Sequence, residues 1–222
     1  MAAVIFLKVN KHLYLRDPQA TELGRNIIDH GIRLIDQIGF EDFTFKKLAK
    51  KIDSTEASVY RYFESKHKLL LYVVAWYWHW IEYRIDRQTM NIDDAEQQLQ
   101  IAIQVLTEST SDDPASSFVD EEILHRVVIA ESSKAFLTTQ AKEYKRQAIF
   151  EGRYALSQKI AALIKEINPK FETPIALASS LIVLAHRQIF YAKYHPDLTE
   201  LKVKKKDASQ VVDFLETLIA SL

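Results

Sequence analysis

The chain of 222 residues is 48% hydrophobic and 27% charged, so it can bury an ample core in one or two domains. Only four Gly and five Pro are present, which leaves strands little to turn on, and this composition predicts an all-α protein. The absence of cysteine excludes disulfide frameworks, thiolate nucleophiles and cysteine-ligated metals, and leaves the redox compartment undetermined.

The formal net charge of −1 hides a division along the chain. Residues 43 to 68 carry seven Lys or Arg against three acidic residues, whereas residues 91 to 122 carry nine acidic residues and no Lys or Arg. The basic segment suits phosphates, and DNA would repel the acidic one. We interpret the acidic segment as a solvated loop rather than a metal site.

The first residues, MAAVIFLKVNK, hold too short an apolar stretch for a signal peptide, and we expect no membrane-spanning segment elsewhere. A cytoplasmic protein with no membrane partner is therefore expected. Residues 1 to 16 include Lys8, Lys11 and Arg16 and are interpreted as a loosely packed tail. An arm that reaches the minor groove of DNA is the alternative.

Asp17 is expected to cap a first helix that has Pro18 at its first position and ends before Gly39. A second helix follows, with Thr44 placed to cap it. Its apolar residues recur at helical spacing and predict one buried face, formed by Phe45, Leu48, Ala49 and Ile52. The opposite face is basic and holds Lys46, Lys47, Lys50 and Lys51.

Asp53 stands at the turn after this helix, where a left-handed backbone is expected. Ser54 or Thr55 then caps a third short helix that buries Val59 and Phe63. The helix turns Glu56, Ser58, Tyr60 and Arg61 outward, and its length suits a recognition helix in a major groove. Ser65 caps the next helix, whose first turn holds Lys66, His67 and Lys68; these cations oppose the helix dipole unless a phosphate binds there.

Residues 27 to 70, from IIDHGIRLIDQIGF through FTFKKLAKKIDSTEASVYRYFESKHKLL, resemble the TetR family of bacterial transcriptional regulators. The resemblance implies that Thr44, Tyr60 and Lys66 contact phosphate and that Ser58 contacts a phosphate or a base. Glu56 stands where the family often has Lys, and Ala57 where it often has Gly, so the operator sequence cannot be predicted. The expected DNA-binding residues are Thr44, Lys46, Lys47, Thr55, Glu56, Ser58, Tyr60, Arg61 and Lys66.

A long helix over residues 66 to 88 connects the DNA-binding part to the rest of the chain. We expect an N-terminal extension at 1–16, a three-helix helix-turn-helix domain at 17–68, and a larger helical effector-binding and dimerisation domain at 69–222. The whole chain should hold about nine helices. Those after the long helix are expected at 93–108, 117–131, 138–167, 174–194 and 207–222.

Aromatic residues crowd the second half of the long helix, and apolar residues on every side predict that protein surrounds it. In the resembled family a cavity beside this helix takes a small molecule. The candidate pocket residues are Trp76, Trp80 and Tyr83, with His125, Tyr154 and His186 as further members. The expected effector is hydrophobic or aromatic, and plain core packing is the alternative.

The seven histidines are scattered, with no spacing typical of a metal site, and the chain has no Gly-rich phosphate loop or nucleophile elbow. We therefore expect no catalytic residue, no metal and no cofactor.

The last two helices combine small residues with apolar ones, which permits close helix approach. The resemblance implies that they pair with their counterparts in a four-helix dimer interface, and internal core is the alternative. The expected interface residues are Leu177, Leu181, Leu184, Phe214 and Leu218. The sequence thus predicts a homodimeric repressor that binds a palindromic duplex operator and is released by a small effector. The alternative is a DNA-binding architectural or interaction protein that has no effector.

Overall fold

The computed structural model describes residues 7–108, 118–136, 149–204 and 207–220. Within these ranges lie nine α-helices and two short 3-10 helices, and the only β-type pairing is an isolated bridge between Lys204 and Asp207. The expected all-α class is confirmed. The chain forms two compact units: residues 1–79 with 110–151, and residues 80–109 with 152–222.

The first unit begins with a segment that is packed rather than loose. Leu13, in the 3-10 helix η1 (Lys11–Leu13), is fully buried, and the N–H of Leu15 donates to the carbonyl of Tyr62 at 2.8 Å. The Tyr14 ring lies edge-on against Tyr72, with the ring centroids 6.0 Å apart. The expectation of a loose tail is therefore wrong for residues 7 to 16, because this segment is bound to Tyr62 and packs against Tyr72. Residues 1 to 6 lie outside the described ranges.

Helix α1 (Glu22–Asp42) starts later than expected. Thr21 caps it by accepting the N–H of Gly24 at 3.0 Å, whereas the Asp17 carboxylate accepts the N–H of Gln19 in a preceding turn. A side chain at position 24 would place its Cβ 2.3 Å from the carbonyl oxygen of Pro18, so this turn folds back onto the helix only with glycine there. Asp17 is thus a turn residue and not the helix cap.

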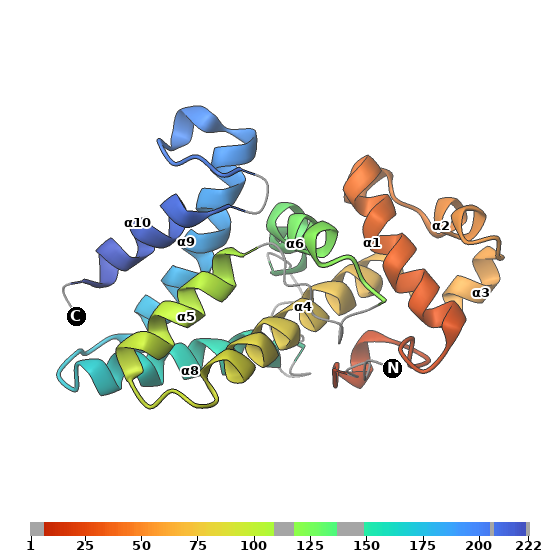
Figure 1. Ribbon diagram of the computed structural model, residues 1–222. Helices are drawn as coiled ribbons and strands as arrows, with labels where there is room; N and C mark the ends of the chain where they lie inside the picture. Colours follow the sequence, from red (N-terminus) through yellow and green to blue (C-terminus); the bar gives the residue numbers. More distant parts are fainter. Residues whose placement is uncertain (1–6, 109–117, 137–148, 205–206, 221–222) are drawn as a thin grey trace. The chain divides into compact units, whose positions relative to one another are not determined.

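Three further helices of the first unit follow α1, and two of them contact it. Helices α2 (Phe45–Lys51) and α3 (Glu56–Tyr60) pack against each other, α2 also contacts α1, and α6 (Glu121–Phe136) packs against α1 (Figure 1). Helix α4 (Lys66–Thr89) begins in this unit and continues into the second. Its residues 69–78 are all buried. In its second half, where burial was expected on every side, Trp80 and Ile81 are buried but His79 and Tyr83 are only half-buried.

The second unit holds four further α-helices: α5 (Ala95–Thr107), α8 (Glu151–Ile167), α9 (Pro174–Tyr194) and α10 (Ser209–Ile219). Helices α5, α9 and α10 pack against one another in pairs, and the 3-10 helix η3 (Pro196–Leu198) follows α9 (Figure 1). The part of the expected 138–167 helix before residue 149 lies outside the described ranges.

Helix α9 has the length and composition of a membrane span, with a mean hydropathy of 1.4. It is the one described helix that passes this test. The same helix packs against α5 and α10 and buries Ala178, Leu181 and Ile182. Apolar helices of soluble cores have the same composition, so this feature alone assigns no membrane role.

Candidate nucleic-acid interface

Helix α2 presents a basic face above a buried one. Thr44 caps the helix, as predicted, by accepting the N–H of Lys47 at 3.2 Å. Phe45 and Leu48 are buried, whereas Lys46 and Lys47 on the outer side are exposed. These outer side chains are therefore accessible to a polyanion.

The turn and the short helix α3 are fixed by local hydrogen bonds. Asp53 has a φ of 50°, the left-handed conformation expected of it. Thr55 rather than Ser54 caps α3, accepting the N–H of Ser58 at 3.2 Å while the two hydroxyls lie 2.9 Å apart. The Thr55 hydroxyl thus stabilises the first turn of α3. Glu56, the first residue of that turn, is exposed.

Tyr60 joins the two helices of the motif. Its ring packs edge-on against Phe45 of α2, with centroids 5.0 Å apart, yet 47% of the residue is exposed. The packing limits the motion of the ring, and the hydroxyl remains at the surface. Arg61 follows at the end of α3 and is exposed. An exposed tyrosine with a packed ring and an exposed arginine next to it in the chain both suit contact with phosphate oxygens.

Lys66 has a different surrounding from the one that the resemblance implied. Its ammonium donates to the carbonyls of Phe40, Glu41 and Phe43, at 3.0, 2.8 and 3.2 Å. An ammonium has three hydrogens, so these carbonyls use its full donor capacity. The expected phosphate contact of Lys66 therefore conflicts with its position, where it neutralises the carbonyl end of α1.

The other cations at the start of α4 are also tied to the protein. Ser65 caps the helix by accepting the N–H of Lys68 at 3.2 Å, and the Lys68 ammonium donates to the carbonyl of His12 at 2.8 Å. Burial, and then the charge of Lys68, lowers the pKa of His67. The unfavourable interaction of Lys66 and Lys68 with the dipole of α4 is thus offset by backbone carbonyls that bind their ammonium groups. These carbonyls belong to distant residues, so the local sequence pattern could not predict them.

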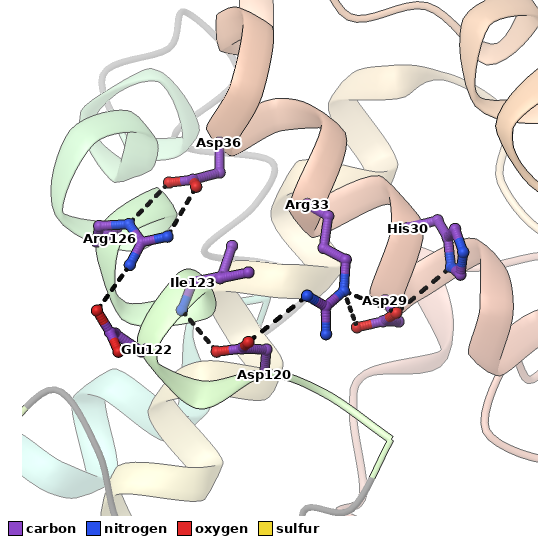
Figure 2. A network of polar contacts seen from close by, with 8 residues as sticks. All are labelled: Asp29, His30, Arg33, Asp36, Asp120, Glu122, Ile123 and Arg126. Atoms are coloured by element: carbon purple, nitrogen blue, oxygen red, sulfur yellow. Dashed lines mark hydrogen bonds and ion pairs between the residues drawn. The ribbon is translucent and has the colours of Figure 1, made fainter.

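A network of ion pairs connects α1 to α6 (Figure 2). Arg126 of α6 donates to both oxygens of Asp36 on α1, at 3.0 and 2.8 Å, and to Glu122 at 3.0 Å. Arg33 of α1 lies 3.0 Å from Asp29 on its own helix and 3.5 Å from Asp120 before α6. Sequence reasoning missed this network, because its partners lie far apart in the chain.

The end of α1 is held by α6 as well. The N–H of Phe40 donates to Glu131 at 3.2 Å, and Lys134 lies 2.7 Å from Glu131 and 3.0 Å from Glu41. These ion pairs raise the pKa of Lys134. Helix α2 begins five residues after Phe40. The contacts of α6 with Phe40 and Glu41 therefore lie next to the start of the helix-turn-helix.

The expected pocket residues are divided between the two units. Trp76 is buried, with its indole N–H 3.4 Å from Gln19 and its ring against Phe118, and His125 is fully buried with its Nδ1 2.9 Å from the hydroxyl of Tyr77. These two lie in the first unit, and the other four lie in the second. Tyr154 is 49% exposed, and its assignment to a pocket stays a prediction.

In the second unit, Trp80 and His186 are buried and Tyr83 is half-buried. Burial, and then the charge of Arg153, lowers the pKa of His186 to about 3. A hollow of about 530 Å³ lies among α5, the end of α8 and α10. Its walls include Leu99, Glu96 and Asp213, and none of the six expected pocket residues lines it.

The expected interface residues differ in exposure. Leu181 is 1% exposed within the chain, so its assignment to a dimer interface is wrong and it belongs to the core. Leu177, Leu184 and Phe214 are half-buried, and Leu218 is 45% exposed. Val183 on α9, 47% exposed, was missed because the sequence pattern selected leucines.

Among the residues described, no three His, Asp or Glu side chains are grouped as metal ligands would be.

The sequence of the helix-turn-helix matches a known protein family. Residues 27–73 match the family model described as bacterial regulatory proteins, tetR family. This segment of the chain is a DNA-binding domain of the TetR family. The matched segment covers α2, α3, most of α1 and the first part of α4, so the helix-turn-helix is the TetR-type DNA-binding domain of a transcriptional regulator. No curated protein matches the sequence.

Solved structures share the fold over nearly the full chain. AibR, crystallised with isovaleryl coenzyme A and operator DNA, is 15% identical, with a TM-score of 0.59 over 89% of this chain and 97% of AibR. A protein from Saccharomonospora viridis crystallised with choline is 16% identical, with a TM-score of 0.63 over 90% and 97%. The superantigen PfiT is 14% identical, with a TM-score of 0.61 over 93% and 98%. At such identities the likeness shows the fold alone.

Proposed function

We propose that this TetR-family regulator is a homodimeric repressor that binds a palindromic duplex operator and releases it when a small effector binds. The observation that carries the proposal is the outer surface of α2 and α3. Lys46, Lys47 and Arg61 are exposed there, and so is Tyr60, whose ring packs against Phe45. Phosphate contacts of this kind fix a recognition helix in the major groove.

A dimer is required because a recognition helix of five residues makes few base contacts. Helix α9 supports it with a face of small and apolar residues that include Ser180 and Val183. The hydroxyls of Ser179 and Ser180 both donate to the carbonyl of Ala176, at 3.1 and 2.7 Å. Polar groups satisfied within the helix can enter an interface without the cost of an unpaired donor.

The contacts between α6 and α1 support regulation by an effector. Arg126 and Glu131 of α6 hold Asp36 and Phe40, near the end of α1 that precedes the helix-turn-helix. A ligand that favours another position of α6 would therefore shift the population of DNA-binding conformations. AibR with its coenzyme A ester and the choline-bound protein show that proteins of this fold carry small ligands.

The test of DNA binding is fluorescence anisotropy with a labelled duplex at several salt concentrations. Lys46→Ala should weaken binding to every sequence and lower the salt slope by about one, because the variant lacks one cation that neutralises a phosphate. Lys170→Ala is the matched control, because Lys170 is an exposed lysine in the second unit. Equal slopes for the wild type and both variants would contradict the proposed surface.

The alternative is a DNA-binding architectural or interaction protein without an effector. The internal partners of Trp76 and His125 favour it, since both side chains are engaged in packing and hydrogen bonding. The two proposals differ in one measurable respect. A regulator should lose operator affinity when a ligand binds, and an architectural protein should not.

A further inference from the structure

We propose that Arg84, inside the second unit, is the anchor for an acidic ligand: an organic carboxylate with an apolar body. The proposal rests on the proposed effector function for its regulatory meaning. The site itself stands on the burial and bonding of this one guanidinium.

Arg84 is a buried cation with too few acceptors. Its side chain is 2% exposed, and its Nη2 donates to an oxygen of Glu108 at 2.6 Å. Nε and Nη1 are inaccessible to solvent and have no hydrogen-bond partner among the described residues. A buried donor without an acceptor is destabilising, and more so when it belongs to a charged group.

Neighbouring carboxylates on α4 do not supply the missing acceptors. Glu82 and Asp86 both form ion pairs with Lys159 of α8. Glu108 itself is 49% exposed, so its ion pair with Arg84 lies on the side that faces solvent. The donors on Nε and Nη1 therefore remain for a group that enters the protein.

The surroundings define the ligand class. The guanidinium lies over the Trp80 ring, 4.9 Å from its centroid, which fixes the plane of its donors. Trp80 and Ile81, one turn before Arg84 on the same helix, are buried. Nη2 carries two hydrogens and Glu108 accepts one, so two adjacent N–H groups can bind a carboxylate side by side. An apolar body would suit the side chains around them.

Octanoate and the neutral octanol are the probes, titrated into the full-length protein by calorimetry and tryptophan fluorescence. The wild type should bind octanoate about tenfold more tightly than octanol, the scale of one charge-assisted hydrogen bond. Arg84→Met should abolish this preference. Lys159→Met is the matched control, since it removes a cation that already has carboxylate partners, and it should keep the preference.

A second variant acts in the opposite direction. Glu108→Gln removes the competing charge from Arg84 and should tighten octanoate binding several-fold without changing octanol binding. If Arg84→Met fails to fold, the titration of Glu108→Gln still tests whether Arg84 binds the carboxylate. Equal affinities for the two probes, no octanoate binding by the wild type, or unchanged octanoate binding in Glu108→Gln would overturn the proposal.

DNA affinity, measured separately with and without octanoate, keeps the two proposals apart. Octanoate binding through Arg84 that leaves DNA affinity unchanged would confirm the carboxylate site and contradict its effector role. A protein that binds octanoate but no duplex DNA would contradict the proposed function and leave the Arg84 site standing.

Discussion

Arg126 on α6 holds both carboxylate oxygens of Asp36 on α1, ninety residues away in the sequence. The two side chains are 27% and 24% exposed, so water screens the pair only in part. A planar guanidinium facing a carboxylate resists rotation as well as separation. This pair therefore fixes the direction of α1 relative to α6.

Arg126→Gln should lower the free energy of unfolding by about 1 kcal/mol, the upper range for a partly exposed ion pair. It should also weaken any effect of an effector on DNA affinity, because α6 would no longer move α1 with it. Chemical denaturation and DNA titrations with and without ligand measure the two effects. Lys170→Gln is the control, since Lys170 is an exposed lysine in the second unit. An equal decrease of coupling in both variants would count against a special role for Arg126.

Lys66→Met should lower the free energy of unfolding by about 1 to 3 kcal/mol, because three carbonyls would no longer have a charged donor. The salt slope of DNA binding should stay the same, since Lys66 has no donor left for phosphate. Thermal melts and salt titrations of the same preparation separate these effects. A slope reduced by about one with unchanged stability would restore the phosphate role and refute the anchoring role.

Glu56→Gln keeps the shape of an exposed side chain at the start of α3 and removes its charge. Nonspecific DNA binding should strengthen, because a carboxylate near phosphates is repelled. The ratio of operator to random-sequence affinity should fall, since a carboxylate can accept from the amino group of cytosine. If only thermal stability changes, Glu56 does no more than favour its own helix dipole.

Val183→Glu should convert the dimer into folded monomers with impaired operator binding, because a charge would enter the proposed interface on α9. Leu198→Glu, at a residue that is 62% exposed in η3, is the matched control and should remain dimeric. Analytical ultracentrifugation gives the mass, and circular dichroism checks the fold. A native protein that sediments as one chain of 25.7 kDa would refute the dimer.

The sequence predicted the helix-turn-helix closely because that motif is encoded locally. The caps at Thr44 and Thr55 and the left-handed Asp53 depend on neighbours within a few residues. The bounds of α9 were likewise predictable, since Pro174 begins the helix and Pro196 follows its end.

Contacts between distant segments escaped prediction. Lys66 binds carbonyls 23 to 26 residues away, and its expected role in phosphate contact came from the resemblance rather than from its surroundings. Leu181 was expected at an interface, yet helical periodicity cannot tell internal core from dimer contact, since both are apolar faces. Tyr154 was expected at a pocket, yet it is 49% exposed, because the residue type alone does not tell whether an aromatic side chain is buried or faces solvent.

The most direct measurement is selection of bound duplexes from a random pool by the wild-type protein, followed by sequencing. We expect enrichment of a palindrome whose half-sites lie about 34 to 36 Å apart or a multiple of this, and we expect Val183→Glu to lose this enrichment. Two results would contradict a dimeric regulator that reads an operator. One is enrichment of a single unpaired half-site, and the other is enrichment of no sequence while the wild type and Val183→Glu bind DNA alike.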